Sequence, residues 1–273
     1  MELFLMINDI RQLTSKPLGL FGGQKPLGVV GGMGSFATAK FLEVLARKSR
    51  AERDQDHIPF ICLSAPNIAD RSKAIAIGSD APLRQILERT YWLEKAGCGA
   101  IAIPCNTAHL WANEIKGALS VKLIDMVEIT RKAIEGSCGS EARNLRSISL
   151  GTSASIRNGL YAWQYDGDFG DEYRRNNHHI QHTATKIIDA VKSGNMAYAH
   201  NALAALIQSI RSIGFDTIVL GCSELSAICG DLSNDADIID PIDILADACI
   251  DWWATEGRSP PDISAARSQG EKR

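Results

Sequence analysis

The sequence has no long apolar run. Among its 273 residues, no window approaches the roughly 18 consecutive apolar residues that a membrane-spanning helix needs. The opening apolar stretch is too short for the core of a secretion signal, carries Glu2 near its start and lacks a cleavage pattern. We therefore expect a cytoplasmic protein that does not associate with membranes.

Paired cysteines are also missing. The seven cysteines are an odd number, are widely scattered and form no Cys-x-x-Cys pair. In a reducing compartment such thiols are mostly small buried residues, so a cysteine needs special surroundings to be assigned another role. His178 and His182 have the four-residue spacing of ligands on one helix face, but no second ligand-rich motif accompanies them. The sequence therefore predicts neither a disulfide framework nor a metal site.

An excess of basic residues is absent as well. The formal net charge is −3 at pH 7, which gives no reason to expect nucleic acid as a partner. The glycine-rich segment 31–34 lacks the Gly-x-Gly-x-x-Gly spacing, and no acidic residue follows at the dinucleotide position. A simple anion-binding turn is therefore favoured over a nicotinamide site, and the expected partner is a small molecule.

The chain does contain short apolar runs that alternate with longer amphipathic stretches. This is the pattern of a parallel sheet covered by helices, and it predicts an α/β fold. The predicted strands are 27–30, 60–63, 100–103, 147–150 and 217–220. The predicted helices are 37–48, 82–95, 107–119, 185–192, 196–212 and 242–253.

An internal repeat divides the chain. The segment 97–106 aligns without gaps on 214–223, and each copy has a glycine, an apolar strand, a cysteine and a small polar residue. Upstream of each copy lies another strand that ends in a glycine turn, at Gly31 and Gly151. Two similar domains related by a pseudo-twofold axis are predicted, each a mainly parallel sheet flanked by helices. We expect an N-terminal arm over 1–25, a first domain over 26–127 plus 241–255, a second over 128–240, and a flexible tail over 256–273.

The repeat pairs two cysteines. Cys105 and Cys222 each follow a predicted strand, and ligands of open parallel sheets bind beyond the carboxyl ends of the strands. A thiol at the start of a helix has its thiolate favoured by free backbone N–H groups, which can bring its pKa down toward neutral. Two opposed thiols suit the inversion of a carbon centre, because one removes a proton from one face while the other delivers a proton to the opposite face.

Such a reaction passes through a carbanion that donors at the substrate carboxylate must stabilise. The backbone N–H groups of the 31–34 turn are candidates, together with Asn106, Thr107, Thr152 and Ser223. His109, four residues after Cys105, is either a group that tunes the thiol or a histidine with a purely structural hydrogen bond. Glu224 either orients the second thiol or is an ordinary acid at a helix start.

The residues of four segments resemble the aspartate/glutamate racemase family. Leu27 to Gly34 looks like the opening of that family, and 104–109 and 221–225 look like its two cysteine motifs. Segment 66–71 resembles the segment that carries the substrate-binding arginine of aspartate racemases. The similarity runs from about Leu27 to Trp253. It implies two α/β domains, no pyridoxal phosphate or metal cofactor, and usually a homodimer.

The resemblance also implies roles for residues. It makes Cys105 and Cys222 the catalytic pair and Arg71 the contact for the side-chain carboxylate of aspartate or glutamate. Members selective for aspartate place a lysine about where Gln181 aligns, and this glutamine puts a strict preference for acidic substrates in doubt. Lys186 or a nearby histidine is the alternative for that role. The predicted substrate-binding residues are Met33, Gly34, Arg71, Asn106, Thr107, Thr152, Gln181 and Ser223.

Two alternatives to amino-acid racemisation stay open. One is another cysteine-dependent reaction on the same scaffold, an isomerase or a decarboxylase of a small diacid; such relatives often lack one of the two cysteines. The other is a non-catalytic amino-acid-binding protein, whose thiols would be no more reactive than free cysteine.

Overall fold

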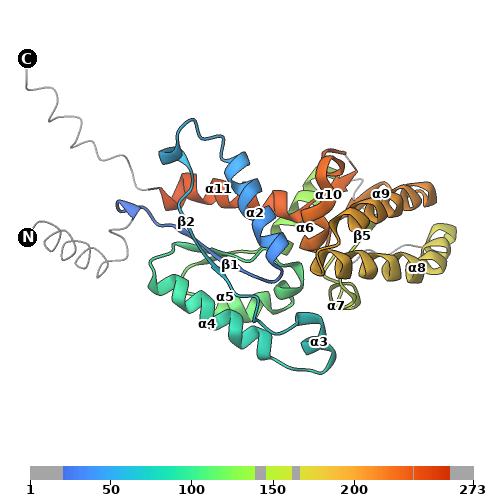
Figure 1. Cartoon of the computed structure of the whole chain (residues 1–273), viewed down its shortest axis with the longest axis horizontal. Coiled ribbons are helices and arrows are strands. Elements are labelled where there is room, and N and C mark those ends of the chain that lie inside the picture. The colour runs from blue at the N-terminus through green and yellow to red at the C-terminus, as the bar shows by residue number, and fades with distance from the viewer. Residues whose placement is uncertain (1–20, 139–145, 162–166, 236, 259–273) are drawn as a thin grey trace, which may run out of the picture.

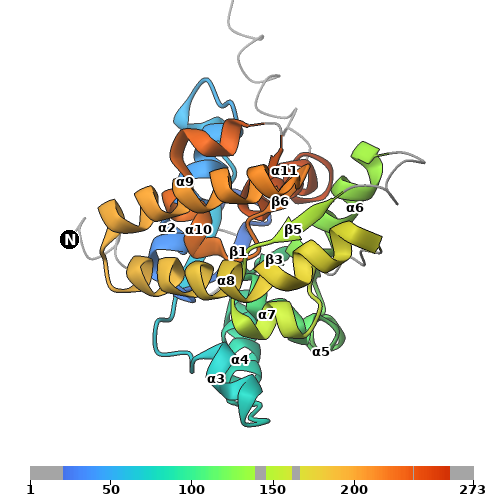
Figure 2. The same cartoon turned by 90° about the vertical axis from the view of Figure 1, so that its right-hand side faces the viewer.

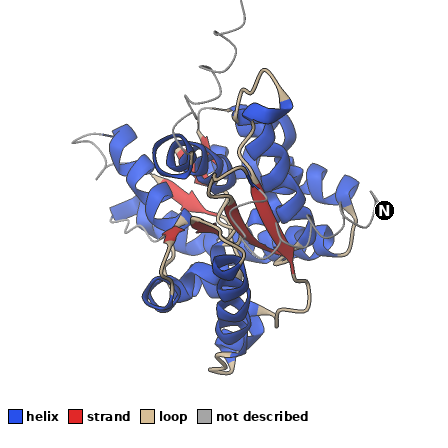
Figure 3. Cartoon of the chain, turned by 90° about the vertical axis from the view of Figure 1, so that its left-hand side faces the viewer, coloured by secondary structure: helices blue, strands red, loops and turns tan. Residues whose placement is uncertain are grey.

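Two parallel sheets form the centre of the molecule. The computed structural model describes residues 21–138, 146–161, 167–235 and 237–258. The first sheet has the strand order β2-β1-β3-β4 and the second has the order β5-β6-β7, and all neighbouring strands run parallel. Helices surround both sheets (Figure 3), as the alternating sequence pattern predicts.

The strands of the first sheet are β1 (Leu27–Gly31), β2 (Phe60–Ser64), β3 (Ala100–Ala102) and β4 (Lys122–Ile124). Every residue of β1 is buried, because β1 lies between two strands and helices cover both of its faces. One face packs on α2 (Ser35–Lys48) and α11 (Pro241–Trp252). The other packs on α4 (Ala81–Lys95) and α5 (Ala112–Ala118), and these two pairs lie on opposite sides of the sheet in Figure 1.

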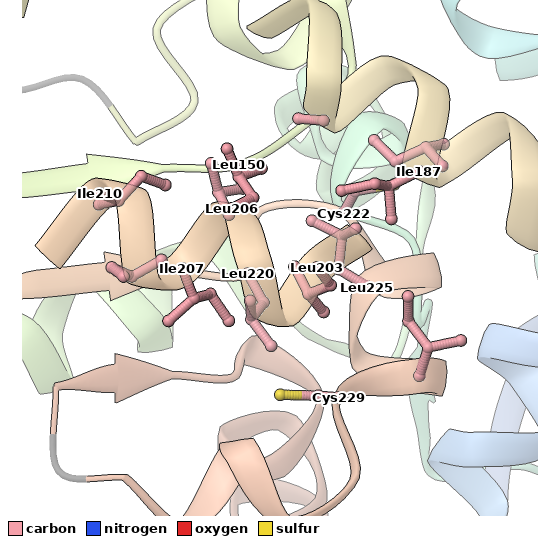
Figure 4. Close-up of a cluster of buried hydrophobic side chains, with 14 of the residues drawn as sticks. Leu150, Ile187, Leu203, Leu206, Ile207, Ile210, Leu220, Cys222, Leu225 and Cys229 are labelled. Carbon is pink, nitrogen blue, oxygen red and sulfur yellow. The ribbon is translucent and has the colours of Figure 1, made fainter. Parts of the chain in front are cut away.

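The strands of the second sheet are shorter: β5 (Ser147–Ser149), β6 (Thr217–Val219) and β7 (Ile238–Ile239). Three helices, α8 (Gly167–Lys192), α9 (Met196–Ile213) and α10 (Ser223–Cys229), bury an aliphatic cluster against this sheet. Figure 2 shows α8 and α9 side by side over β5 and β6, and Figure 4 shows the cluster, which includes Leu203, Ile207 and Leu220. The apolar spacing of both helices places one face of each in this core.

Each sheet with its helices makes one of two similar domains, called here the first and second half. The first half also holds α3 (Arg71–Ala76) and the second half holds α7 (Ser153–Arg157), while α6 (Met126–Cys138) connects the halves along the chain. The halves touch through α3 on α7 and through α10 on α2. Since α11 packs on α2 and α6, we propose that 241–255 returns to the first domain, with the boundaries given above.

The predicted strands are confirmed, but two helices differ from their predicted form. Residues 107–119 form two elements, the 3₁₀ helix η3 (Asn106–Trp111) followed by α5. In a continuous α-helix the carbonyl of Cys105 would accept a hydrogen bond from the backbone N–H of His109. Here it is bonded instead to the His109 ring nitrogen Nδ1, at 2.9 Å. The predicted helix 185–192 is only the end of α8, whose polar first half hides the apolar spacing.

The ends of the chain fall partly outside the described residues. Residues 1–20 of the predicted arm and 259–273 of the predicted tail lie there. Glu256 and Gly257 belong to the π-helical turn η6 (Trp253–Gly257), and the carbonyl of Gly257 accepts a hydrogen bond from the backbone of Lys25. Two further 3₁₀ turns are η2 (Asp54–Asp56) and η5 (Gly230–Asn234). Within the described ranges no helix combines the length and the apolar character needed to cross a bilayer.

Candidate active site

A small cavity lies between the two halves, beyond the carboxyl ends of β1, β3, β5 and β6. Its lining residues come from turns and helix starts of both halves: Met33, Asp70, Arg71, Ser72, Cys105, Asn106, Thr107, Thr152, Lys192, Cys222, Ser223 and Glu224. All the predicted site residues except Gly34 and Gln181 are among them. The free space inside is only about 10 Å³, roughly that of one water molecule.

The two cysteines occupy equivalent positions. Cys105 follows β3 and Cys222 follows β6, and each immediately precedes a short helix. Their backbones are alike, with φ −146° and ψ 108° at Cys105 and φ −136° and ψ 125° at Cys222. Each is almost fully buried, with 5% and 4% of the residue exposed. The internal repeat of the sequence therefore brings two thiols to one cavity from two sheets.

The surroundings of the two thiols are not equivalent. Burial raises the pKa of Cys105 most strongly, the Arg71 guanidinium beside it lowers that pKa, and the Glu224 carboxylate raises it, with a net rise. Burial also raises the pKa of Cys222 well above its usual value, and Glu224 raises it further through its charge and a hydrogen bond. Cys222 Sγ donates that bond to Glu224 Oε2 at 3.0 Å.

The expectation of lowered cysteine pKa values is therefore wrong. It was based on the helix starts and on the polar residues that follow each cysteine. Removal of both thiols from water disfavours the thiolate more than these short helices favour it. Arg71 makes Cys105 the one of the pair whose thiolate a cation supports.

Hydrogen bonds join the halves directly at the cavity. Thr107 Oγ1 and Thr152 Oγ1 are 3.0 Å apart, and Asn106 Nδ2 donates to Ser223 Oγ at 3.4 Å. The buried Tyr161 hydroxyl donates to Asn106 Oδ1 at 2.8 Å. These two bonds hold the Asn106 amide between the tyrosine and the serine, with its oxygen toward Tyr161 and its NH₂ group toward Ser223. Tyr161 had no distinguishing signal in the sequence.

The glycine turn after β1 serves the fold as much as the site. Gly32 has φ +90°, and a Cβ on it would lie 2.5 Å from the backbone of Ala65, so glycine is required there. The Gly32 N–H donates to Thr38 Oγ1 at 2.9 Å. This N–H group is therefore used within the protein, contrary to the expectation that the whole turn offers its donors to a substrate.

Arg71 and Lys192 bring positive charge to the cavity from opposite halves. Arg71 Nη1 donates to the carbonyls of Ile68 and Ala69 at 3.3 and 3.2 Å, while its buried Nε has no hydrogen-bond partner. Lys192, an exposed residue at the end of α8, lies at the rim. Asp70 lies between these charges; burial raises its pKa, but its bond from the Lys73 backbone N–H and the charges of Lys192 and Arg71 lower it overall.

Gln181 lies outside the cavity, so the structure does not support its prediction as a substrate contact. Its Nε2 donates to the Gly151 carbonyl at 3.1 Å and to Thr185 Oγ1 at 3.2 Å. With His178 and His182 it lines a separate depression on the second half. Eleven residues of helix, about three turns, separate Gln181 from Lys192. The lysine at the cavity is Lys192, a residue that the sequence analysis did not assign to the site.

His109 contacts the backbone of the catalytic candidate rather than its sulfur. The Met126 backbone N–H donates to Nε2 at 3.2 Å, so the ring proton resides on Nδ1, which donates to the Cys105 carbonyl. Burial lowers the pKa of His109, which keeps the ring neutral. The structural alternative for this histidine is therefore the correct one.

The other cysteines lie away from the cavity. Cys98, Cys229 and Cys249 are buried and Cys62 is half-buried, and burial raises the pKa of Cys98 and Cys229 to about 12. Their assignment as core residues is confirmed for the three buried ones; the side chain of Cys138 lies outside the described residues. Trp252 and Trp253 are buried in the first-half core, as expected of core packing. In the described part of the chain, no three His, Cys, Asp or Glu residues gather closely enough to hold a metal ion.

This fold is shared with known racemases. The chain is 29% identical over 233 residues to the broad specificity amino-acid racemase RacX of Bacillus subtilis (strain 168), which covers 83% of this chain and 97% of that relative. The aspartate racemase of Picrophilus torridus superposes with a TM-score of 0.71 at 27% identity, covering 86% of this chain and 96% of that one. Glutamate racemase from Thermus thermophilus has the same fold, with a TM-score of 0.57 at 19% identity over 88% and 84% of the two chains.

These likenesses define the class as an α/β isomerase with two similar domains. The family model for Asp/Glu/Hydantoin racemases matches residues 30–249. The chain therefore belongs to the Asp/Glu/Hydantoin racemase family and is an enzyme of the amino-acid racemase type.

Proposed function

We propose that the chain racemises a free amino acid by two-base proton transfer between Cys105 and Cys222. The observation that carries this proposal is the convergence of two buried thiols on one cavity from equivalent positions of the two halves. Each stands in the same backbone conformation at the end of a parallel strand. A decarboxylase or a one-base isomerase has no use for the second thiol.

In the proposed reaction the thiolate of one cysteine takes the Cα proton and becomes a thiol. The thiol of the other cysteine then gives its proton to the opposite face of the carbanion and becomes the thiolate, so the pair ends with its charge exchanged. Asn106 Nδ2, the Thr107 and Thr152 hydroxyls and Ser223 are the side-chain donors available to the substrate carboxylate. Donors aimed at that group stabilise the charge that develops during proton removal.

For the substrate we propose aspartate first and glutamate second. Arg71, with an unpartnered buried Nε, and Lys192 supply two cations to a side-chain carboxylate. The Picrophilus torridus neighbour is an aspartate racemase. A second candidate is an amino acid with another side chain, because Asp70 lies in the same cavity beside Lys192 and offsets part of its charge, and the Bacillus subtilis relative has broad specificity.

Deuterium exchange at Cα tests this proposal. The protein should catalyse incorporation of solvent deuterium into both enantiomers of aspartate in heavy water, together with loss of optical rotation. The same measurement with glutamate, alanine and lysine ranks the side chains. A folded protein that exchanges no amino acid of this panel while it still binds one of them would be a binding protein, and the proposal would be wrong.

We also propose that the enzyme is a homodimer formed through β2. The open edge of β2 adjoins a cavity of about 750 Å³ against α4, where Phe60 and Trp92 are 39% and 68% exposed. Pro59 and Ala65 bond to β1, so by strand alternation the backbone groups of residues 60, 62 and 64 point outward. An antiparallel copy centred on Cys62 would pair Cys62 with its own copy and Phe60 with Ser64 of the other chain.

Sedimentation should therefore give about twice the 29.6 kDa of one chain. Trp92→Asp should shift that mass to the monomer, since a charge enters an apolar contact. The matched change Glu114→Gln on exposed α5 should leave the dimer intact. A monomeric wild-type protein at micromolar concentration would exclude this assembly.

A further inference from the structure

Glu224 is a buried carboxylate with one unused oxygen. Only 4% of the residue is exposed, and it forms part of the cavity wall in the first turn of α10. Its Oε2 accepts the Cys222 thiol proton at 3.0 Å. Its Oε1 is buried and has no hydrogen-bond partner.

No cation of the described chain forms an ion pair with Glu224, although two cations line the same cavity. Arg71 bonds to the carbonyls of residues 68 and 69 and lies beside Cys105. A buried carboxylate without a cation is costly, and so is a buried acceptor without a donor.

The space next to Oε1 is kept free of side chains. A Cβ on Gly34 would lie 2.9 Å from Oε1, so any larger residue would press on the carboxylate. Gly34 stands directly before α2 and directly after Met33, which lines the cavity. The unpaired oxygen therefore belongs to a residue of the cavity wall and lies against the backbone of Gly34.

We propose that Glu224 Oε1 binds the α-ammonium group of the substrate. The ammonium ion supplies both the positive charge and the N–H donor that Glu224 lacks in the empty protein. Arg71 and Lys192 bring positive charge to the cavity, and Asp70 and Glu224 bring negative charge, so the cavity suits an amino acid better than a simple dicarboxylate. This assignment rests on the proposed function only in taking an amino acid as the ligand.

Glu224 then has two tasks. Oε2 keeps the proton on Cys222, and Oε1 holds the nitrogen on Cα close to that same thiol. This second task distinguishes the proposed role from a simple adjustment of the thiol pKa, which needs only Oε2. It also predicts that compounds with a hydroxyl in place of the ammonium bind poorly.

Paired ligands isolate this contact from every other role of Glu224. Calorimetric Kd values would be measured for aspartate against malate, and for alanine against lactate, in the Cys105→Ser protein, which does not consume the ligand. The amino compound should bind about 10- to 100-fold more tightly than its hydroxy partner, the range of a charge-assisted hydrogen bond. Adding Glu224→Gln should reduce this ratio to within about twofold, because the amide keeps the shape and loses the charge.

The change Glu114→Gln, on exposed α5, is the control and should leave the ratio unchanged. If Glu224 had only a structural or thiol-tuning role, its replacement would weaken the binding of both ligands of a pair equally. The ratio of their Kd values would then stay the same. A ratio that survives Glu224→Gln, or the absence of a preference before that change, would overturn the assignment. Should the glutamine protein not fold, Glu224→Asp gives the same test with a partial loss. Deuterium exchange by the wild-type protein tests racemisation separately, so the two failures are distinguishable.

Discussion

Replacing Cys105 or Cys222 by serine should lower racemisation of the preferred amino acid by at least about 10³-fold. A serine hydroxyl is much less acidic than a thiol, so it can neither hold the charge after proton delivery nor take the Cα proton. Both changes remove only polarisable volume from buried positions, and thermal unfolding should change little. The measurement is the rate of optical-rotation loss from each enantiomer.

The two serine variants should differ in the residual deuterium exchange that they catalyse. Each keeps one thiol, which can still remove a proton from the enantiomer that faces it and return solvent deuterium to the same side. Weak exchange of one enantiomer in one variant, and of the other enantiomer in the other, assigns each cysteine to a face. Cys62→Ser, at a half-buried cysteine outside the cavity, should retain full activity. A two-base scheme fails if either site variant keeps a tenth of the wild-type rate.

Arg71→Gln should lower kcat/KM for aspartate by about 10²- to 10³-fold. The change removes a cation from the cavity and with it both carboxylate binding and the support of the Cys105 thiolate. Because Arg71 lowers the pKa of Cys105, its loss should raise that pKa and move the rising, thiolate-dependent limb of the pH–rate profile to higher pH. A rate loss without this alkaline movement would show that Arg71 acts on the substrate alone.

Lys192 and Gln181 provide a matched comparison for the same carboxylate site. Lys192→Met should raise KM for aspartate about tenfold and leave alanine almost unaffected, because only aspartate presents a second carboxylate. Gln181→Met should change neither, since Gln181 bonds to Gly151 and Thr185 away from the cavity. Equal effects of Lys192→Met on aspartate and alanine would show that the side-chain carboxylate of aspartate does not bind at Lys192.

The parts of the site that the sequence reveals are those carried by local pattern. The strand, cysteine and polar residue recur in both halves, so the pairing of Cys105 with Cys222 needs no three-dimensional information. Lys192 could not be found in this way. Lys192 lines the cavity at the end of a helix of 26 residues. An alignment error of a few residues along a helix selects a residue on another face and another turn.

The electrostatics of the site also depend on tertiary structure. A cysteine before a helix predicts a stabilised thiolate and a lowered pKa. The packing of one half on the other buries both thiols and raises their pKa values instead. Likewise, Cys-Ser-Glu in the sequence does not reveal that one Glu224 oxygen bonds the thiol and the other is unpaired. Tyr161 reaches Asn106 from the other half, across 55 residues of chain.

The 10 Å³ of free space in the cavity has a consequence for the timing of each turnover. An amino acid cannot enter while Thr107 is hydrogen-bonded to Thr152 and Asn106 is hydrogen-bonded to Ser223. The two halves must therefore move apart to admit the substrate and again to release the product. The proton that the carbanion recovers comes from one of the two sulfurs, so the handedness of the product depends on which thiol carries a proton when the halves close.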